Sequence, residues 1–166
     1  ELAGAEVELI ELDQREYRLK NALQAGHATY DFILIDCPPA LNMLTVNGLV
    51  AADSVLIPMQ CEYYALEGLS DLVETLRKVR THLNSRLEIE GLLRTMYNPQ
   101  STLTQQVSGE LESHFGSKVY QTIVPRNVRL AEAPSYGKPV IAFDKSSKGA
   151  QAYSALAKEI LERVAP

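Results

Sequence analysis

Short apolar runs alternate with amphipathic stretches along most of the chain, and this alternation limits the fold more than any other feature of the sequence. Apolar runs without helical periodicity indicate strands that are covered on both faces. The stretches between them place apolar residues three and four positions apart, which is typical of amphipathic helices. The expected strands are 32–35, 54–57, 89–96 and 119–124, with 140–143 as a candidate fifth, and the expected helices are 2–12, 15–25, 42–51, 63–84, 103–115 and 153–164.

This order of elements predicts the fold class. Strands that alternate with helices favour right-handed crossover connections and a mostly parallel sheet with helices on both faces. The chain has 166 residues, enough for one domain with a sizeable core, and no long linker or internal repeat divides it. We therefore expect a single α/β domain over 1–166, in which Pro58 ends the second strand because proline has no N–H.

Composition excludes several classes of protein. No apolar run approaches the roughly 20 residues that cross a bilayer, and no basic-then-apolar leader begins the chain. Cys37 and Cys61 fit neither a disulfide framework nor a zinc site, so reduced thiols of a cytoplasmic protein are expected. The net charge of -5 argues against general nucleic-acid binding, but 118–148 holds six bases against two acids and predicts a local basic face.

Polar residues and prolines follow the expected strands, at the point where each strand ends. Asp36, Cys37, Pro38 and Pro39 follow the first strand, and 58–64, 98–100 and 125–129 follow the next three. In an open parallel sheet, ligands bind outside the carboxyl ends of the strands. The sequence therefore predicts a shared ligand site along this edge.

Asp36 is the most informative of these residues, because a carboxylate at the end of a buried strand is costly unless it is paired. One interpretation is a magnesium site of a phosphate-binding ATPase, where an aspartate after an apolar strand holds Mg²⁺ directly or through water. The other is that Asp36 caps the helix at 42–51 or pairs with a basic residue. Pro38 and Pro39 fix the backbone and predict a stiff turn, suited to sensing a γ-phosphate.

A phosphate-binding ATPase also needs a glycine-rich loop with a lysine that leads into a helix. The pattern GxxxxGK[ST] does not occur in the 166 residues. Either the ATPase interpretation is wrong or the loop precedes Glu1. The second alternative agrees with a chain that begins with Glu1 rather than Met.

Several segments together resemble ParA-type (Soj-like) chromosome-partitioning ATPases, members of the deviant Walker-A P-loop family. "YDFILIDCPP" resembles the Walker B and switch II segment, and "QCEYYALEGL" the stretch after the next strand. "PRNVRLAEAPSYGKP" resembles the most recognisable late motif of the family, and "LAGAEVEL" also matches. The resemblance covers essentially the whole chain and implies a P-loop NTPase-like fold whose first third, with its N-terminal strands, is missing.

The resemblance implies a site for ATP or ADP with Mg²⁺. Asp36 would position Mg²⁺ through water as the catalytic carboxylate, and Cys37, Pro38 and Pro39 would form the switch. Met96, Pro125, Arg126 and Asn127 would border the adenine, Asn127 through its amide. A core-filling role for Met96 remains the alternative. Without the phosphate loop, the chain alone is expected not to hydrolyse ATP.

The resemblance also implies binding to DNA and to proteins. Arg129, supported by Arg126 and Lys138, would bind DNA phosphates without sequence preference. Many relatives carry arginine where this chain has Gln100, which weakens the expected DNA contact unless Arg94 or nearby lysines compensate. A homodimer that closes on ATP, a ParB-type centromere-binding partner and a cytoplasmic, nucleoid-associated location are expected.

Two other functions compete with DNA partitioning. A membrane-associated division-site ATPase of the same superfamily would need a basic amphipathic C-terminal helix, whereas "LAKEILERVAP" balances Lys158 and Arg163 against Glu159 and Glu162. A non-enzymatic module, such as a phospho-accepting receiver, would need an acidic pair and a late lysine after its strands. Cys37 stands where the second acid of a receiver would be, and Pro125 stands where its lysine would be, so no receiver is expected. The balanced charges of the C-terminal helix predict no membrane contact.

Overall fold

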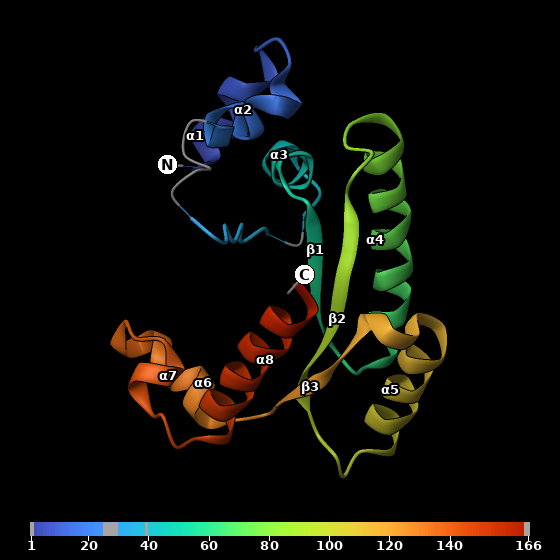
Figure 1. The fold of residues 1–166 in the computed structure, drawn as a ribbon, viewed down its shortest axis with the longest axis vertical. Helices are drawn as coiled ribbons and strands as arrows, with labels where there is room; N and C mark the ends of the chain where they lie inside the picture. The colour runs from blue at the N-terminus through green and yellow to red at the C-terminus, as the bar shows by residue number, and fades with distance from the viewer. Residues whose placement is uncertain (1, 25–29, 39, 165–166) are drawn as a thin grey trace. The chain divides into compact units, whose positions relative to one another are not determined.

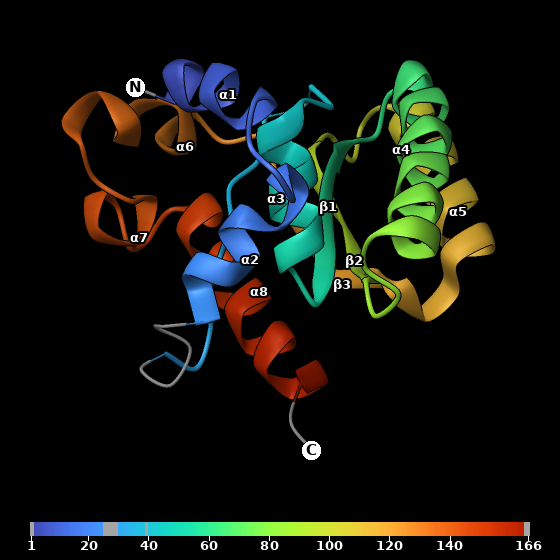
Figure 2. The same ribbon diagram turned by 90° about the horizontal axis from the view of Figure 1, so that it is seen from above.

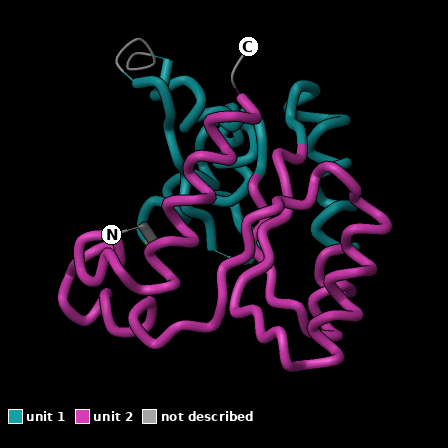
Figure 3. Tube along the Cα trace, turned by 60° about the horizontal axis from the view of Figure 1, so that its bottom comes forward, with its two compact units in different colours: residues 1–55, 70–88 teal, residues 56–69, 89–166 magenta. Residues whose placement is uncertain are grey.

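The structure is a computed structural model that describes residues 2–24, 30–38 and 40–164. By their contacts the residues form two compact units (Figure 3). The first unit comprises Glu1–Val55 and Ser70–Glu88, and the second unit comprises Leu56–Leu69 and Ile89–Pro166. The helix α4 (Tyr63–His82) begins in the second unit and ends in the first.

The first unit is mainly helical, and its helices lie where the sequence predicts them. It contains α1 (Leu2–Ile10), the 3-10 turn η1 (Arg15–Tyr17), α2 (Arg18–Gln24) and α3 (Met43–Ala51) (Figure 1). Buried Asn47 of α3 joins them, because its amide donates to the carbonyl of Arg15 at 2.8 Å and accepts from the N–H of Leu19 at 3.1 Å. The helices predicted at 2–12, 15–25 and 42–51 are therefore confirmed, each slightly shorter than expected.

The loop after α4 is held against the end of α3 by one side chain. The amide of Asn84 donates to the carbonyls of Leu49, Val50 and Ala52 at 2.8–3.2 Å. These carbonyls lie at the C-terminal end of α3, where helices leave acceptors without intrahelical donors. The side-chain amide of Asn84 thus supplies hydrogen-bond donors to the carbonyls at the C-terminal end of α3.

The strand predicted at 32–35 is wrong. Residues 30–38 have no regular secondary structure, Phe32 is half exposed and Leu34 is 93% exposed. An apolar run becomes a strand only when neighbouring strands accept and donate its backbone hydrogen bonds. None of the described strands pairs with 32–35, so this run remains extended chain.

The second unit is built on a three-stranded sheet with the order β1-β2-β3 among the described residues. Its strands are β1 (Ser54–Gln60), β2 (Glu88–Tyr97) and β3 (Val119–Pro125), which confirms three of the predicted strands. β2 and β3 are parallel. Contrary to prediction, Pro58 does not end β1, which continues to Gln60; β1 is an edge strand of this sheet, where a missing N–H is tolerated.

Helices cover the two faces of this sheet, as predicted. α5 (Thr102–Phe115) and α8 (Lys148–Val164) both contact β3 and lie on opposite sides of it (Figures 1 and 2). Leu93 of β2, Tyr120 and Val124 of β3 and Leu156 of α8 form the buried core on the α8 side. The fold class, an α/β protein with a parallel sheet between helices, is confirmed.

The candidate strand at 140–143 is wrong, because this segment is the short helix α7 (Val140–Phe143). Pro139 precedes it, and the carbonyl of Pro139 accepts from the N–H groups of Ala142 and Phe143 at 2.9 Å. Val140 packs with Ala133 and Ala150 in a small core of its own. These hydrogen bonds to Pro139 hold the apolar run 140–143 in a helical turn, although its composition would also suit a strand. α6 (Val128–Glu132) and the 3-10 turn η4 (Ala133–Tyr136) complete this region.

A carboxylate of α8 accepts hydrogen bonds from backbone N–H groups of β3. Glu159 accepts from the N–H groups of Gln121 and Thr122 at 2.8 Å, and from Arg163 at 2.8 Å. Burial, the largest single influence, raises the pKa of Glu159, but the hydrogen bonds from Thr122, Gln121 and Arg163 outweigh it and hold the pKa below its usual value. The ionised carboxylate therefore stabilises the fold.

We expect Glu159→Gln to remove an acid-sensitive part of the stability. A depressed carboxyl pKa stabilises above the unfolded pKa of about 4.3 and loses this effect as pH falls through the folded value. The wild-type free energy of unfolding should exceed that of the variant by about 1 to 3 kcal/mol at pH 7, and the difference should shrink below pH 4. Urea unfolding at several pH values measures it. Glu162→Gln, an exposed residue of the same helix, is the control; an equal effect in both variants would contradict the assignment.

Candidate functional site

The carboxyl ends of β2 and β3 bring four of the predicted site residues together. Tyr97, next to Met96, pairs in register with Pro125, and the N–H of Arg126 donates to the carbonyl of Tyr97 at 3.2 Å. Asn127 follows directly and begins α6. We call residues 96–97 and 125–127 the strand-end rim. The rim is where the sequence placed a ligand site, and its members come from two strands that are separated by α5.

Met96 has a strained backbone within this rim. Its φ is 52°, in the left-handed region that non-glycine residues rarely adopt, and the register of β2 and β3 shifts between Arg94 and Tyr97. Its side chain is 47% exposed, so the alternative of a core-filling methionine is wrong. Strained residues cost of order 1–3 kcal/mol and cluster at ligand sites. The apolar, polarisable side chain is thus accessible, and a planar ring could pack against it.

Asn127 uses half of its amide within the chain. Its Oδ1 accepts from the N–H of Arg129 at 3.1 Å and so caps α6. The NH₂ group has no hydrogen-bond partner within the described part of the chain. Both N–H donors therefore remain for a ligand, together with the second lone pair of Oδ1, and the donors suit a ring-nitrogen acceptor. Arg126 is exposed and has no ion pair with a described residue.

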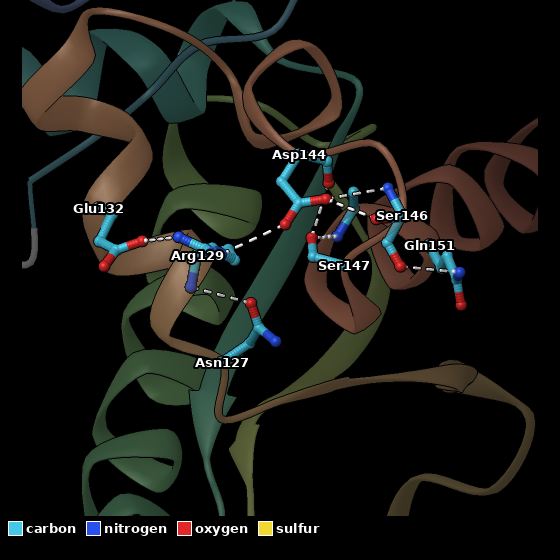
Figure 4. A network of polar contacts seen from close by, with 8 residues as sticks. Asn127, Arg129, Glu132, Asp144, Ser146, Ser147 and Gln151 are labelled. Atoms are coloured by element: carbon cyan, nitrogen blue, oxygen red, sulfur yellow. Dashed lines mark hydrogen bonds and ion pairs between the residues drawn. The ribbon is translucent and has the colours of Figure 1, made fainter.

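Arg129 is paired rather than free (Figure 4). Its Nη1 donates to Glu132 Oε2 at 2.8 Å, and its Nε lies 3.3 Å from Asp144 Oδ2. Hydrogen bonding to Glu132 and the charges of Glu132 and Asp144 raise the pKa of Arg129. Asp144 is itself held by Ser146, whose N–H and Oγ–H donate to Oδ1 at 3.2 and 2.8 Å. The hydrogen bond from Ser146 is the largest cause of the lowered pKa of Asp144.

Lys138 is one of the residues that line a pocket. The pocket has a volume of about 330 Å³ and is lined mainly by apolar groups, among them Leu130, Ala133, Val140 and Tyr153. Lys138 follows Gly137, whose positive φ of 61° closes η4. Lys138, Lys145 and Lys148 are exposed, so the basic face predicted for 118–148 is accessible in this region.

Asp36 lies in the first unit on the extended segment 30–38. It is exposed and has no hydrogen bond or ion pair with any described residue. Asn42 caps α3 instead, because its Oδ1 accepts from the N–H of Thr45 at 3.0 Å. The interpretations of Asp36 as a helix cap or as the partner of a base are therefore wrong for the described residues.

Cys37, next to Asp36, lies close to α3. A Cβ on Gly48 would lie 2.8 Å from Cys37 Sγ and 3.4 Å from Ile35 Cγ2, so this segment approaches α3 closely only because residue 48 is glycine. Burial, and then the charge of Asp36, raises the pKa of the Cys37 thiol. Pro38 is exposed, and Pro39 lies outside the described residues.

Arg94 does not compensate for Gln100, contrary to the expectation. Arg94 is only 5% exposed, and its guanidinium donates to Ser108, Glu112 and the carbonyl of Tyr120. Gln100 is exposed, and its N–H donates to Asn98 in the turn before α5. The sequence does not distinguish Arg94 from a surface base, because its partners, such as Ser108 and Tyr120, lie 14 to 26 positions away.

The sequence also missed the acidic partners of Arg129. Glu132 follows three positions later, a spacing that signals a helical ion pair. Asp144 comes from the turn before α8 and carries no such signal. No group of three or more metal-ligating side chains occurs among the described residues. No helix in the described ranges is long and apolar enough to cross a membrane.

Comparison with known proteins relates the chain to one family model and to several chromosome-partitioning proteins. The family described as "AAA domain" matches residues 1–89. Sporulation initiation inhibitor protein Soj of Bacillus subtilis is 57% identical over 160 residues, covering 96% of this chain and 63% of that protein. Chromosome partitioning protein ParA of Caulobacter vibrioides is 51% identical over 165 residues, covering 98% and 62%.

A solved structure matches the fold at similar coverage. Cobyrinic acid a,c-diamide synthase from Mycobacterium smegmatis, with bound ATP analog and magnesium, superposes with a TM-score of 0.76 and 34% identity. The match covers 95% of this chain and 57% of that chain. The sheet and helices described above therefore recur in a nucleotide-binding protein.

The chain belongs to the AAA-domain family. The two curated relatives named above are chromosome-partitioning proteins of the Soj and ParA type, which confirms the resemblance read from the motifs. The chain spans 63% and 62% of the lengths of the two relatives named above.

Proposed function

We propose that the protein is a ParA-type ATPase that partitions chromosomal or plasmid DNA. The identity of more than 50% to Soj and ParA over nearly the whole chain carries this proposal. The 166 residues would be the C-terminal two-thirds of one ATPase domain, and a glycine-rich phosphate loop would precede them in the full-length protein. By itself the chain would not hydrolyse ATP, because no such loop occurs within it.

The strand-end rim supports an adenine site. Met96 presents an exposed, polarisable side chain from a strained position, and Pro125, Arg126 and Asn127 lie beside its neighbour Tyr97. Base stacking on such groups tolerates imperfect geometry, whereas Asn127 supplies directional donors. The rim would therefore hold the base of ATP or ADP, with the Asn127 NH₂ facing a ring nitrogen.

Asp36 fits a role in holding Mg²⁺. Magnesium keeps several waters and is commonly bound by one or two carboxylates together with substrate phosphates. A single exposed carboxylate without an internal partner suits this arrangement, and a full cage of protein ligands is not required. The metal would supply charge neutralisation for the phosphates. Asp36 would position a metal-bound water, and Cys37, Pro38 and Pro39 would carry the response to ATP.

Partners follow from the same proposal. An ATP-closed homodimer would bind DNA without sequence preference, and a ParB-type centromere-binding protein would stimulate hydrolysis. The protein would be cytoplasmic and associated with the nucleoid. α8 gives no support to the membrane-associated alternative, because its Leu156 and Glu159 are engaged with β3 rather than available to a lipid surface.

The DNA contact is tested by Arg129→Ala in the full-length protein with ATP and Mg²⁺. We expect DNA affinity to fall about tenfold and the slope of log affinity against log salt to decrease by about 0.9, because one phosphate contact is lost. Fluorescence anisotropy with duplexes of two unrelated sequences measures both values. Lys158→Ala removes an equal charge from exposed α8 and serves as the control. Equal losses in the two variants would contradict a contact at Arg129, and ATP turnover measured in parallel tests the enzymatic part of the proposal.

A further inference from the structure

The guanidinium of Arg129 already pairs with two carboxylates. Glu132 Oε2 accepts from Nη1, and Asp144 Oδ2 lies against Nε (Figure 4). An arginine has five N–H donors in a planar fork, and carboxylate and phosphate oxygens bind this fork in the same way. Nη1 and Nε of Arg129 are therefore occupied by carboxylate oxygens, which bind a guanidinium as phosphate oxygens do.

This pairing distinguishes Arg129 from the other predicted DNA-binding residues. Arg126 and Lys138, like Lys145 and Lys148, have no ion pair with any residue in the described part of the chain. Among the predicted DNA-binding residues, only Arg129 is paired with acids within the described part of the chain. Arg129 is also the residue for which the late motif implies the main DNA contact.

We propose that Glu132 and Asp144 lower the DNA affinity of Arg129 by competing with DNA phosphate for its guanidinium. The inference rests on the proposed DNA contact of Arg129. Binding to DNA would require the guanidinium to leave at least one carboxylate. The two acids would thus keep the contact weak and reversible, as a protein that repeatedly binds and leaves DNA requires.

The contacts have the properties that displacement needs. The side chains are 48% exposed for Arg129, 41% for Glu132 and 28% for Asp144, so water and salt already weaken the ion pairs. Asp144 stays in place when Arg129 leaves, because Ser146 donates two hydrogen bonds to its other oxygen, Oδ1. It would therefore remain a fixed negative charge beside the incoming phosphate.

Asp144→Asn tests the proposal without removing the turn. Asparagine keeps the Oδ1 acceptor for Ser146 and loses the charge that faces Arg129. We expect DNA affinity of the full-length protein with ATP and Mg²⁺ to rise about threefold. Glu132→Gln should act in the same direction and provides a second variant should the first disturb the loop. Fluorescence anisotropy at several salt concentrations is the measurement.

Two comparisons separate competition from a general change of charge. Glu162→Gln removes one negative charge from an exposed site of α8 that has no ion pair with a described residue, and it should have a smaller effect. In the Arg129→Ala background, Asp144→Asn should have no more effect than Glu162→Gln, because the group it competes for is gone.

The outcomes distinguish this inference from the proposed function. If Arg129→Ala lowers affinity but Asp144→Asn and Glu132→Gln match Glu162→Gln, the DNA contact stands and the competition is overturned. A loss of affinity in both acid-neutralised variants would also overturn it, since the acids would then orient Arg129 for binding. If Arg129→Ala equals its Lys158→Ala control, the DNA contact itself fails, and the competition fails with it.

Discussion

Replacing Asp36 by asparagine in the full-length protein is expected to lower ATP turnover about 10- to 100-fold, the usual cost of losing an outer-shell partner of a metal. Asparagine keeps the shape but loses the charge that would hold a metal-bound water. Since Asp36 has no hydrogen bond or ion pair with a described residue, the substitution leaves no internal partner unpaired, and stability should hardly change. Steady-state hydrolysis across a magnesium titration measures the effect, which should include a higher Mg²⁺ requirement.

Asp31→Asn is the matched control, because Asp31 is an exposed acid on the same extended segment. It removes the same charge five positions earlier and should leave turnover and Mg²⁺ requirement unchanged. Turnover of Asp36→Asn equal to that of the control would remove Asp36 from the metal site. Equal turnover with a lower unfolding midpoint would instead assign Asp36 a structural role, despite its exposure.

Elements with a strong local pattern could be predicted from the sequence. α4 and α5 each carry an apolar stripe at helical spacing, and Gly116 ends α5 with a φ of 50°. β2 lies between α4 and α5 along the chain, and β2 and β3 each carry buried apolar residues, such as Leu92 and Val124. For these elements the information that determines the structure lies within a few residues along the chain.

The errors arise where distant residues decide the outcome. The run 32–35 has the composition of a strand, but a strand needs hydrogen-bonding neighbours, and no described strand lies beside it. The run 140–143 has the same composition, yet the turn at Pro139 and the packing of Val140 make it a helix. The apolar composition of both runs favours burial, but it does not determine whether the backbone forms a strand, a helix or an irregular segment.

The same distinction applies to the candidate site. The strand-end rule predicts 125–127 of the rim from the order of elements alone, whereas Met96 is predicted only through the family resemblance. It gave no information on the strain at Met96 or on Asp144, which reaches Arg129 from 15 positions later. A charged side chain is therefore placed on a surface or in a core by partners that the local sequence does not contain.

Arg94 makes this point with a measurable consequence. Its guanidinium lies between β2, β3 and α5, where Nη1 donates to Ser108 Oγ at 2.8 Å and to Glu112, and Nη2 donates to the carbonyl of Tyr120 at 2.9 Å. We expect Arg94→Ala to lower the free energy of unfolding by about 3 kcal/mol, because it leaves a cavity and buried acceptors without donors. Urea unfolding followed by circular dichroism is the measurement.

Glu112→Gln should cost much less, within about 1 kcal/mol, because its side chain is 56% exposed and the guanidinium keeps its other two acceptors. Arg126→Ala, which removes an exposed arginine of the rim, should leave stability unchanged and provides the control for loss of charge. A surface base that binds DNA would behave in the opposite way, since Arg94→Ala would then preserve stability and weaken DNA binding. Stability and DNA affinity measured on the same variant thus separate a base that holds the sheet to α5 from one that reaches the phosphates.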